Sequence, residues 1–255
     1  DNNEDYVLTS KDAPVWILAD GVGGHDAGEI ASELACNQIM QAIHQGNSIN
    51  ESILLAHQAI LKAAKNGHGK AGMATTIVVM VADEDLCQIS WVGDSRAYLI
   101  DENGCSQLTE DHSLVQELVN AGQITKEEAV THPSKNVVLQ VLGMTEPDIP
   151  KVSSLQQYLE KDDMVLLCSD GLSDVVTESE IFRIINAADS LEAAANRLIE
   201  LAIENGSRDN ITVELVKRLT DKNNKSNGTL ISETCDKPVS KGWIGRCLSL
   251  FNKVK

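Results

Sequence analysis

Basic residues are scarce in this chain of 255 residues: 21 Lys and Arg stand against 38 Asp and Glu, a formal net charge of −17. An acidic surface repels a phosphate backbone, so the composition argues against nucleic-acid binding. The same excess of carboxylates is expected where oxygen ligands gather around hard divalent cations, although most acidic surfaces bind no metal.

Long apolar runs and paired cysteine motifs are absent. No stretch approaches the roughly 18 apolar residues that span a bilayer, and residues 1–20 lack the basic start and apolar core of a signal peptide. The six cysteines form no CxxC pair. Those that lie inside apolar runs, where cysteine behaves as a small buried hydrophobe, are Cys36, Cys87 and Cys168. These absences predict a reducing compartment and a cytoplasmic protein.

Hydrophobic residues make up 42% of the chain, which is enough for a sizeable core. Apolar residues at helical spacing predict helices over 27–45, about 50–67, 113–131 with a break at Gly122, 177–185 and 190–206. Asn50 is expected to cap the second helix, and Ser190 starts the last one. Thr177 and Glu180 form a T-x-x-E capping box.

Stretches rich in β-branched residues, partly alternating with polar ones, predict strands over 14–20, 75–81, 88–92, 97–100, 105–108, 164–168 and 210–216. A tight turn is expected at Asn103-Gly104, within an antiparallel meander. Residues 136–142 fit either a helix or a strand. Helix pairs separated from meandering strands predict an α+β fold, a sheet sandwich flanked by helices, rather than a parallel doubly wound sheet.

The composition changes near Thr220. Residues 220–255 hold seven basic and three acidic side chains, a charge of +4, so residues 1–219 carry −21. We therefore expect a domain over 1–219, followed by a polar linker and a basic amphipathic tail over 220–255. For residues 241–255 the alternatives are binding to an anionic membrane, docking as a helix on a partner protein, disorder, or folding back onto the acidic body.

Acidic residues recur at the ends of the predicted strands and beside turns: Glu4, Asp5, Asp20, Asp170 and Asp209. Carboxylates at strand ends can converge at one edge of a sheet, where mutual repulsion raises each pKa unless cations neutralise the cluster. Oxygen-only ligation without His–Cys spacing favours Mg²⁺ or Mn²⁺ over Zn²⁺. Gly21 and Gly24 allow a backbone carbonyl or a phosphate to come close. Each acidic turn fits a structural role by itself, but the set indicates a divalent-metal site.

These residues belong to seven motifs that together resemble the metal-dependent Ser/Thr protein phosphatases of the PPM (type 2C) family, particularly its compact bacterial members. In chain order the motifs are NNED (2–5), DGVGGHDAGEIAS (20–32), ATTIVV (74–79), VGDSRAYLI (92–100), LTEDHSLVQELVNAGQIT (108–125), LLCSDGLSDVV (167–176) and SRDNITV (207–213). The resemblance runs from Asn3 to about Val216. It implies two antiparallel sheets in a four-layer α-β-β-α sandwich, with two metal ions, Mn²⁺ or Mg²⁺, at one end.

The resemblance also implies roles for individual residues. Asp20 would bridge both metals, the carbonyl of Gly21 would bind one of them, and Asp170 and Asp209 would bind the other. Asp20, Asp170 and Asp209 would thus form the catalytic set. Glu4 would contact its metal directly or through water.

A third, weaker metal is implied by the resemblance to bacterial members. Asp111 would help to hold this ion, and Asp94 and Asp174 are further candidates near it. Asp5 would support the two-metal site from nearby.

Two positions depart from the family pattern. Many eukaryotic relatives have His at the third position of DGHGG, where this chain has Val22. His25 and His112 lie nearby in the sequence, and each is interpreted as a turn or surface histidine. The family's phosphate-binding arginine would fall one residue before Asp1, and Arg96 is expected to have a structural role rather than to replace it.

The implied activity is hydrolysis of phosphoserine and phosphothreonine in proteins, by a hydroxide that bridges two metal ions and attacks phosphorus in line. The expected partners are phosphorylated proteins and an opposing bacterial Ser/Thr kinase, and a monomer is expected. Residues 108–135 correspond to the family's flap, which would shape substrate access. One alternative is a catalytically silent partner-binding module, which has no chemical need for all three aspartates. Another is a structural Ca²⁺-binding domain, but the chain lacks a D-x-D-x-D-G loop.

Overall fold

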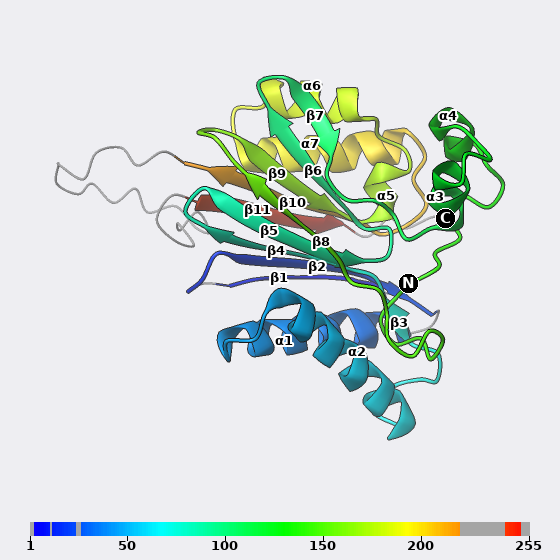
Figure 1. Ribbon diagram of the computed structural model, residues 1–255. Helices are drawn as coiled ribbons and strands as arrows, with labels where there is room; N and C mark the ends of the chain where they lie inside the picture. The colour runs from blue at the N-terminus through cyan, green and yellow to red at the C-terminus, as the bar shows by residue number, and fades with distance from the viewer. Residues whose placement is uncertain (1–2, 11, 24–26, 220–242, 251–255) are drawn as a thin grey trace.

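Two antiparallel sheets face each other between two layers of helices in the computed structural model, which describes residues 3–10, 12–23, 27–219 and 243–250 (Figure 1). The first sheet has the order β1-β2-β4-β5-β8, with β3 paired to β2. Its strands are β1 (Asp5–Thr9), β2 (Val15–Val22), β3 (Ala74–Thr75), β4 (Ile77–Asp83), β5 (Leu86–Val92) and β8 (Ser153–Tyr158). The second sheet has the order β11-β10-β9-β6-β7. Its strands are β6 (Arg96–Asp101), β7 (Gly104–Gln107), β9 (Met164–Cys168), β10 (Ile211–Arg218) and β11 (Trp243–Leu250).

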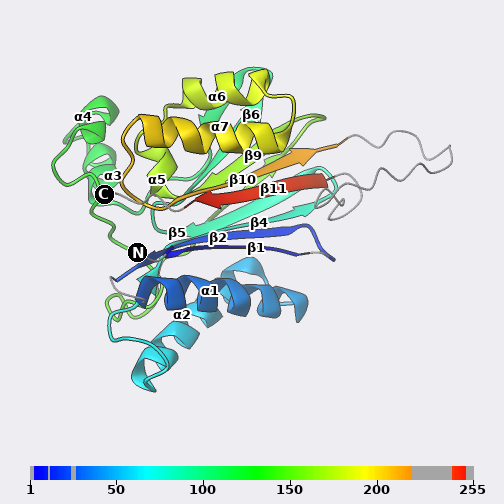
Figure 2. The ribbon, with the colours of Figure 1, turned by 180° about the vertical axis from the view of Figure 1, so that it is seen from behind.

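The helices cover the outer faces of both sheets. On the first sheet lie α1 (Ala27–His44) and α2 (Ile49–Lys65), and on the second lie α6 (Glu178–Ala187) and α7 (Leu191–Glu204) (Figure 2). At one end of the sandwich stand α3 (Leu114–Asn120), α4 (Lys126–Val130) and α5 (Asp170–Ser173). This arrangement confirms the predicted α+β sandwich flanked by helices.

Alternation along the strands divides the core into three apolar layers. Ile17 and Ala19 of β2 pack with α1 and α2, whereas Trp16 and Leu18 of the same strand face the second sheet. All four side chains are buried, because successive residues of a strand point to opposite faces and both faces of β2 are covered. The third layer lies between the second sheet and α6 and α7.

The helix caps agree with those predicted from the sequence, except in α2. The capping box of Thr177 and Glu180 and the N-cap at Ser190 are confirmed. The cap predicted at Asn50 is wrong, since Ser48 accepts a hydrogen bond from the Glu51 amide and completes a capping box. The Asn50 side chain instead accepts a hydrogen bond of 2.9 Å from the Ser90 hydroxyl and so joins α2 to β5.

The break predicted at Gly122 is confirmed, since this residue, with a φ of 67°, lies between α3 and α4. Two other local expectations change. Residues 136–142 form neither a helix nor a strand and pair only through isolated bridges. The turn of the β6–β7 hairpin is Glu102-Asn103, one residue earlier than predicted, because Asp101 pairs with Gly104. Strand β8 was not predicted at all.

The last described segment adds a strand to the second sheet. β11 runs antiparallel to β10, with a register from Ile211 opposite Leu250 to Arg218 opposite Trp243. Of the alternatives for the tail, folding back onto the domain therefore describes residues 243–250, and a docking helix does not. The linker call for 220–242 lies outside the described residues. Within the described chain, no helix combines the length and the apolar character needed to cross a bilayer.

A carboxyl group is buried inside the sandwich at Glu214 of β10. Its Oε1 accepts a hydrogen bond from the hydroxyl of Thr9 in β1, and its Oε2 has no hydrogen-bond partner. Burial raises the pKa of Glu214 to about 8, although the bond from Thr9 acts in the opposite direction. The folded protein therefore holds this proton more tightly than the unfolded chain does.

This burial predicts a pH-dependent stability. Because the pKa of Glu214 rises from an ordinary 4.5 to about 8 on folding, the free energy of unfolding should fall as the pH rises through that interval. The substitution Glu214→Gln should remove this part of the slope and stabilise the protein at pH 8, relative to wild type, by about 4 kcal/mol. Urea unfolding at pH 5 and pH 8 measures it, with the exposed Glu102→Gln as control. Identical slopes in all three proteins would contradict the prediction.

Candidate active site

Two acidic residues meet where β1 pairs with β2. The register places Asp5 directly opposite Asp20, and the Gly21 amide donates a hydrogen bond of 3.0 Å to the Glu4 carbonyl. Thr76 holds the Asp20 backbone from the other side, donating from its amide to the Asp20 carbonyl (2.8 Å) and accepting at its hydroxyl from the Asp20 amide (3.2 Å). Asp20 is thus fixed between two neighbouring strands.

Hydrogen bonds join the two sheets at this edge. Ser169, directly after β9, donates from its hydroxyl to Asp5 Oδ2 (2.9 Å) and accepts from the Thr212 amide (3.0 Å). The Glu4 amide donates to Asn210 Oδ1 (2.9 Å). The acidic end of the first sheet is therefore attached to the ends of β9 and β10.

Asp170 and Asp209 reach this edge from the second sheet. Asp170 is the first residue of α5 and follows β9, whereas Asp209 lies just before β10, which pairs antiparallel with β9. A Cβ at Gly171 would lie 2.0 Å from the Asn210 carbonyl oxygen. Only glycine therefore allows the start of α5 to pack against the segment that carries Asp209.

Glycines also create space on the side of the first sheet. A Cβ at Gly21 would lie 2.4 Å from the Gly28 carbonyl group, and a Cβ at Gly28 would lie 2.1 Å from Glu4 Oε2. The absence of side chains at these two positions lets the Glu4 carboxylate lie against the first turn of α1, next to Gly21. The structure thus brings together all the residues assigned to the two-metal site.

The carboxyl groups raise one another's pKa. Burial raises the pKa of Asp20 well above its usual range, and the charges of Asp5 and Asp170 raise it further. The pKa of Asp170 is also raised well above its usual range, first by burial and then by Asp94 and Asp209. Burial raises the pKa values of Asp5 and Asp94 to about 6. These carboxyl groups act as one electrostatic cluster.

The donor set of this cluster fits a hard divalent cation. Asp170 Oδ1 is buried and has no hydrogen-bond partner, although it lies among other carboxyl groups. No three His, Cys, Asp or Glu side chains in the described part of the chain already surround a single point, so a bound ion would complete its ligands with backbone carbonyl oxygen and water. Carboxylate, carbonyl and water are the ligands that Mg²⁺ and Mn²⁺ take in proteins.

The candidates for a third metal have other partners. Arg96 forms an ion pair with Asp111, with Nη2 2.7 Å from Oδ2 and Nε 2.9 Å from Oδ1, and donates from Nη1 to the Tyr98 hydroxyl (3.1 Å). Arg96 therefore has the structural role expected of it. Asp94 is buried in the turn between β5 and β6, where Asp111 contributes to its raised pKa. The assignment of Asp94 and Asp111 to a metal stays a prediction.

Sequence reasoning missed Lys135. Its Nζ lies 2.7 Å from Oδ2 of Asp174, the residue that caps the C-terminus of α5. This pair attaches the segment after α4 to the acidic end of the sandwich. The signal in the sequence was weak, since one lysine in a polar loop resembles any other solvated lysine.

The interpretation of His112 as a turn or surface histidine is wrong. Its ring is buried and stacked on Trp91, with centroids 6.3 Å apart. Nδ1 accepts a hydrogen bond from the Gly93 amide (3.2 Å), which leaves the proton on Nε2, and Nε2 donates to Ser153 (2.9 Å). Burial lowers the pKa of His112, so the neutral ring acts as a structural link. His25 lies outside the described residues.

Buried carboxyl groups at one edge of a helix-flanked sandwich of two antiparallel sheets form a site of the kind found in metal-dependent enzymes. Residues 1–205 match the Protein phosphatase 2C family, and the chain belongs to that family.

Similar proteins are bacterial phosphatases. Serine/threonine phosphatase stp of Listeria monocytogenes serovar 1/2a is 38% identical over 235 residues, covering 87% of this chain and 92% of that protein. Protein phosphatase PhpP of Streptococcus pneumoniae strain D39 is 39% identical over 228 residues, covering 84% and 91%.

Solved structures agree with the fold. Serine/threonine phosphatase Stp1 from Staphylococcus aureus matches with a TM-score of 0.78 at 33% identity, over 85% of this chain and 89% of that one. The catalytic domain of serine threonine protein phosphatase PstP, solved in complex with two manganese ions, matches with a TM-score of 0.71 at 32% identity, over 84% and 90%.

The packing at Gly171 predicts the effect of a single methyl group. Gly171→Ala should lower the free energy of unfolding by about 2 kcal/mol, because the new Cβ meets backbone that cannot move aside cheaply. Gly69→Ala is the matched control, since its Cβ would meet the flexible end of the Met73 side chain and, at an ordinary contact distance of 3.7 Å, Ile30 Cγ2. Urea unfolding of both variants measures the difference. Equal losses of stability would show that α5 is not held as tightly as the structure indicates.

The ion pair of Lys135 predicts a local effect. Lys135→Met should release the segment after α4, and the amides of residues 132–137 should exchange hydrogen about threefold faster, as expected for the loss of a partly exposed ion pair. Lys217→Met, which removes a 3.0 Å ion pair to Asp162, is the control. Hydrogen exchange read by mass spectrometry separates the two. Unchanged exchange in the first variant would mean that the pair does not hold this segment.

Proposed function

We propose that this chain hydrolyses phosphoserine and phosphothreonine in proteins with the help of two bound divalent cations, Mn²⁺ or Mg²⁺. The observation that carries the proposal is the cluster of buried carboxyl groups from both sheets, with an unpartnered oxygen on Asp170. Membership of the Protein phosphatase 2C family and the Ser/Thr phosphatases among the relatives support the same activity.

The residues of the cluster have separable tasks. Asp20, Asp170 and Asp209 would hold the cations with the carbonyl of Gly21, and Glu4 would contribute directly or through water. When bound, such a pair of cations supplies a hydroxide at neutral pH and stabilises negative charge on the phosphoryl oxygens. Asp5 does not need to bind an ion, because its hydrogen bond from Ser169 fixes the end of β1 beside Asp20.

The catalytically silent alternative finds no support. A binding module has no chemical reason to bury several carboxyl groups against one another, since burial and mutual repulsion both disfavour their charged forms. The named relatives that cover most of the chain are phosphatases.

The substrates of the enzyme are phosphorylated proteins. We infer that it opposes a bacterial Ser/Thr kinase and acts as a monomer in the cytoplasm. Free thiols at four cysteines of the described chain are consistent with a reducing compartment. The pairing of β11 with β10 favours a role of the last segment in the domain rather than on a membrane.

The test is the substitution Asp170→Asn, which removes ligand charge at nearly constant volume. We expect kcat for a phosphothreonine peptide with Mn²⁺ to fall at least about 100-fold, a loss of roughly 3 kcal/mol of transition-state stabilisation. Circular dichroism should show a retained fold, and a chelator should abolish turnover by the wild type. The exposed Asp189→Asn is the control. Near-native turnover by the Asp170 variant under saturating Mn²⁺ would contradict the metal assignment.

A further inference from the structure

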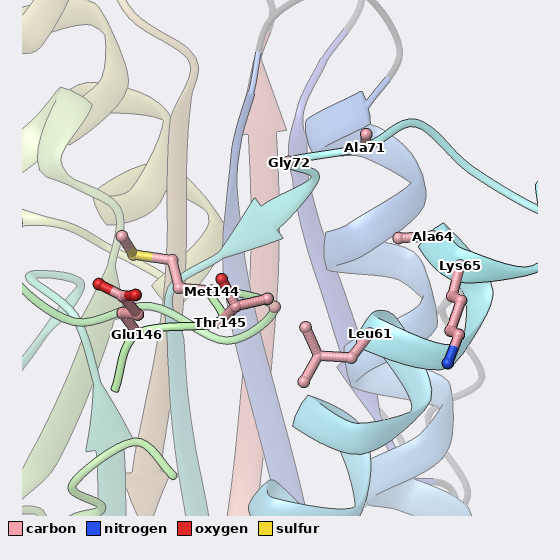
Figure 3. A pocket seen from close by; sticks show the side chains of 9 residues that line it. Leu61, Ala64, Lys65, Ala71, Gly72, Met144, Thr145 and Glu146 are labelled. Carbon is pink, nitrogen blue, oxygen red and sulfur yellow. The ribbon is translucent and has the colours of Figure 1, made fainter. Parts of the chain in front are cut away.

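An apolar groove of about 760 Å³ lies beside β3, outside the carboxyl cluster. Its walls come from the C-terminal half of α2, the residues before β3 and the segment 143–146, and Figure 3 shows Leu61 extending from α2 toward Thr145 on the opposite wall. Most of its surface is apolar, with Ala64, Ala71 and Met144 among the lining residues. Its volume lies in the range typical of ligand-binding sites.

The groove is preformed because both of its walls are tied together. His57 of α2 is buried, and its Nδ1 accepts a hydrogen bond from the Gly143 amide (3.2 Å). Its Nε2 therefore carries the proton and donates to the Asp148 carbonyl (3.1 Å). Leu142 and Thr75 exchange backbone hydrogen bonds of 2.8 and 3.1 Å. The segment 143–148 is thus attached to α2 and to β3, so an incoming group finds the walls in place.

Strand β3 connects the wall of the groove to the carboxyl cluster. Thr75 pairs with Gly21, and its hydroxyl donates to the Asp20 carbonyl (2.8 Å). At the groove, a Cβ on Gly23 would lie 3.3 Å from the carbonyl oxygen of Gly72. Gly72 precedes Thr75 by three residues, so their Cα atoms are at most about 11 Å apart. Three or four residues of extended peptide cover that distance.

Charge disfavours an acidic occupant, and the mostly apolar walls favour an apolar occupant over a basic one. Residues 1–219 carry −21, so acidic groups of a substrate are repelled. The groove itself has one residue of each sign, Lys65 and Glu146, at opposite sides in Figure 3. An apolar side chain can gain binding energy here without paying this electrostatic cost.

We propose that the groove binds an apolar side chain of the phosphoprotein substrate, three or four residues away from the phosphorylated serine or threonine. This inference rests on the proposed function and adds a sequence preference to it. The groove acts on substrate binding only, because none of its lining residues belongs to the carboxyl cluster.

The experiment compares phosphothreonine peptides that carry Leu or Ser three and four residues from the phosphothreonine, on each side in turn. On one of the two sides of the phosphothreonine, the wild type with Mn²⁺ should hydrolyse the Leu peptide with a kcat/KM about 10-fold higher than that of the Ser peptide. The difference should lie mainly in KM. Ala71→Phe should reduce the ratio to near one, since the ring fills the groove from an exposed position. Thr145→Trp, exposed on the opposite wall, is a second filling variant. Ala193→Phe, exposed on α7 in the opposite layer, should keep the preference.

Hydrolysis of p-nitrophenyl phosphate separates the two proposals. All variants should hydrolyse this small substrate as the wild type does. If the wild type hydrolyses it and the peptides but shows no preference for Leu, or if both filling variants keep the preference, the groove proposal is wrong and the phosphatase function stands. If the wild type hydrolyses no substrate with Mn²⁺, both proposals are wrong.

Discussion

Repulsion between buried carboxyl groups at one edge of the sandwich has to be overcome for the two sheets to meet there. Asp20 and Asp170 are each disfavoured as anions by burial and by the neighbouring acids. The protein offers only partial relief, since the hydroxyl of Ser169 donates to Asp5 while one oxygen of Asp170 has no partner. A cation removes this cost, and so the binding of metal and the stability of this edge are coupled.

The two sheets supply the rigidity that holds like charges together. Asp20 comes from the first sheet and Asp170 from the end of β9, and the hydrogen bonds from Ser169 to Asp5 and from Glu4 to Asn210 connect them. The apolar layer between the sheets keeps the separation of the two sheets fixed, because protein interiors packed as densely as crystals resist deformation. The strands therefore position the chemistry, and helices α1, α2, α6 and α7 stabilise the strands.

Whether a feature could be predicted from the sequence depends on whether the residues that form it contact near or distant parts of the chain. Asp20, Asp170 and Asp209 were predictable because they interrupt apolar strands at turns, a pattern visible in the chain. The strand β8 was missed because SSLQQY has little apolar alternation and is held by backbone pairing with β5. His112 was misinterpreted because its partners, Trp91 and Ser153, lie far along the chain. Local patterns thus encode strand ends and caps, whereas contacts between distant segments decide burial.

Chemistry and recognition occupy different parts of this edge. The carboxyl groups belong to strand ends and to the first turn of α5, where backbone pairing leaves little freedom. Around them lie loops that are held by a few contacts each, such as Lys135 with Asp174 and His57 with the segment 143–148. Loops tolerate change of sequence far better than paired strands do. Substitutions in these loops can therefore alter which phosphoprotein is bound while the buried carboxyl groups, fixed by both sheets, keep the same reaction.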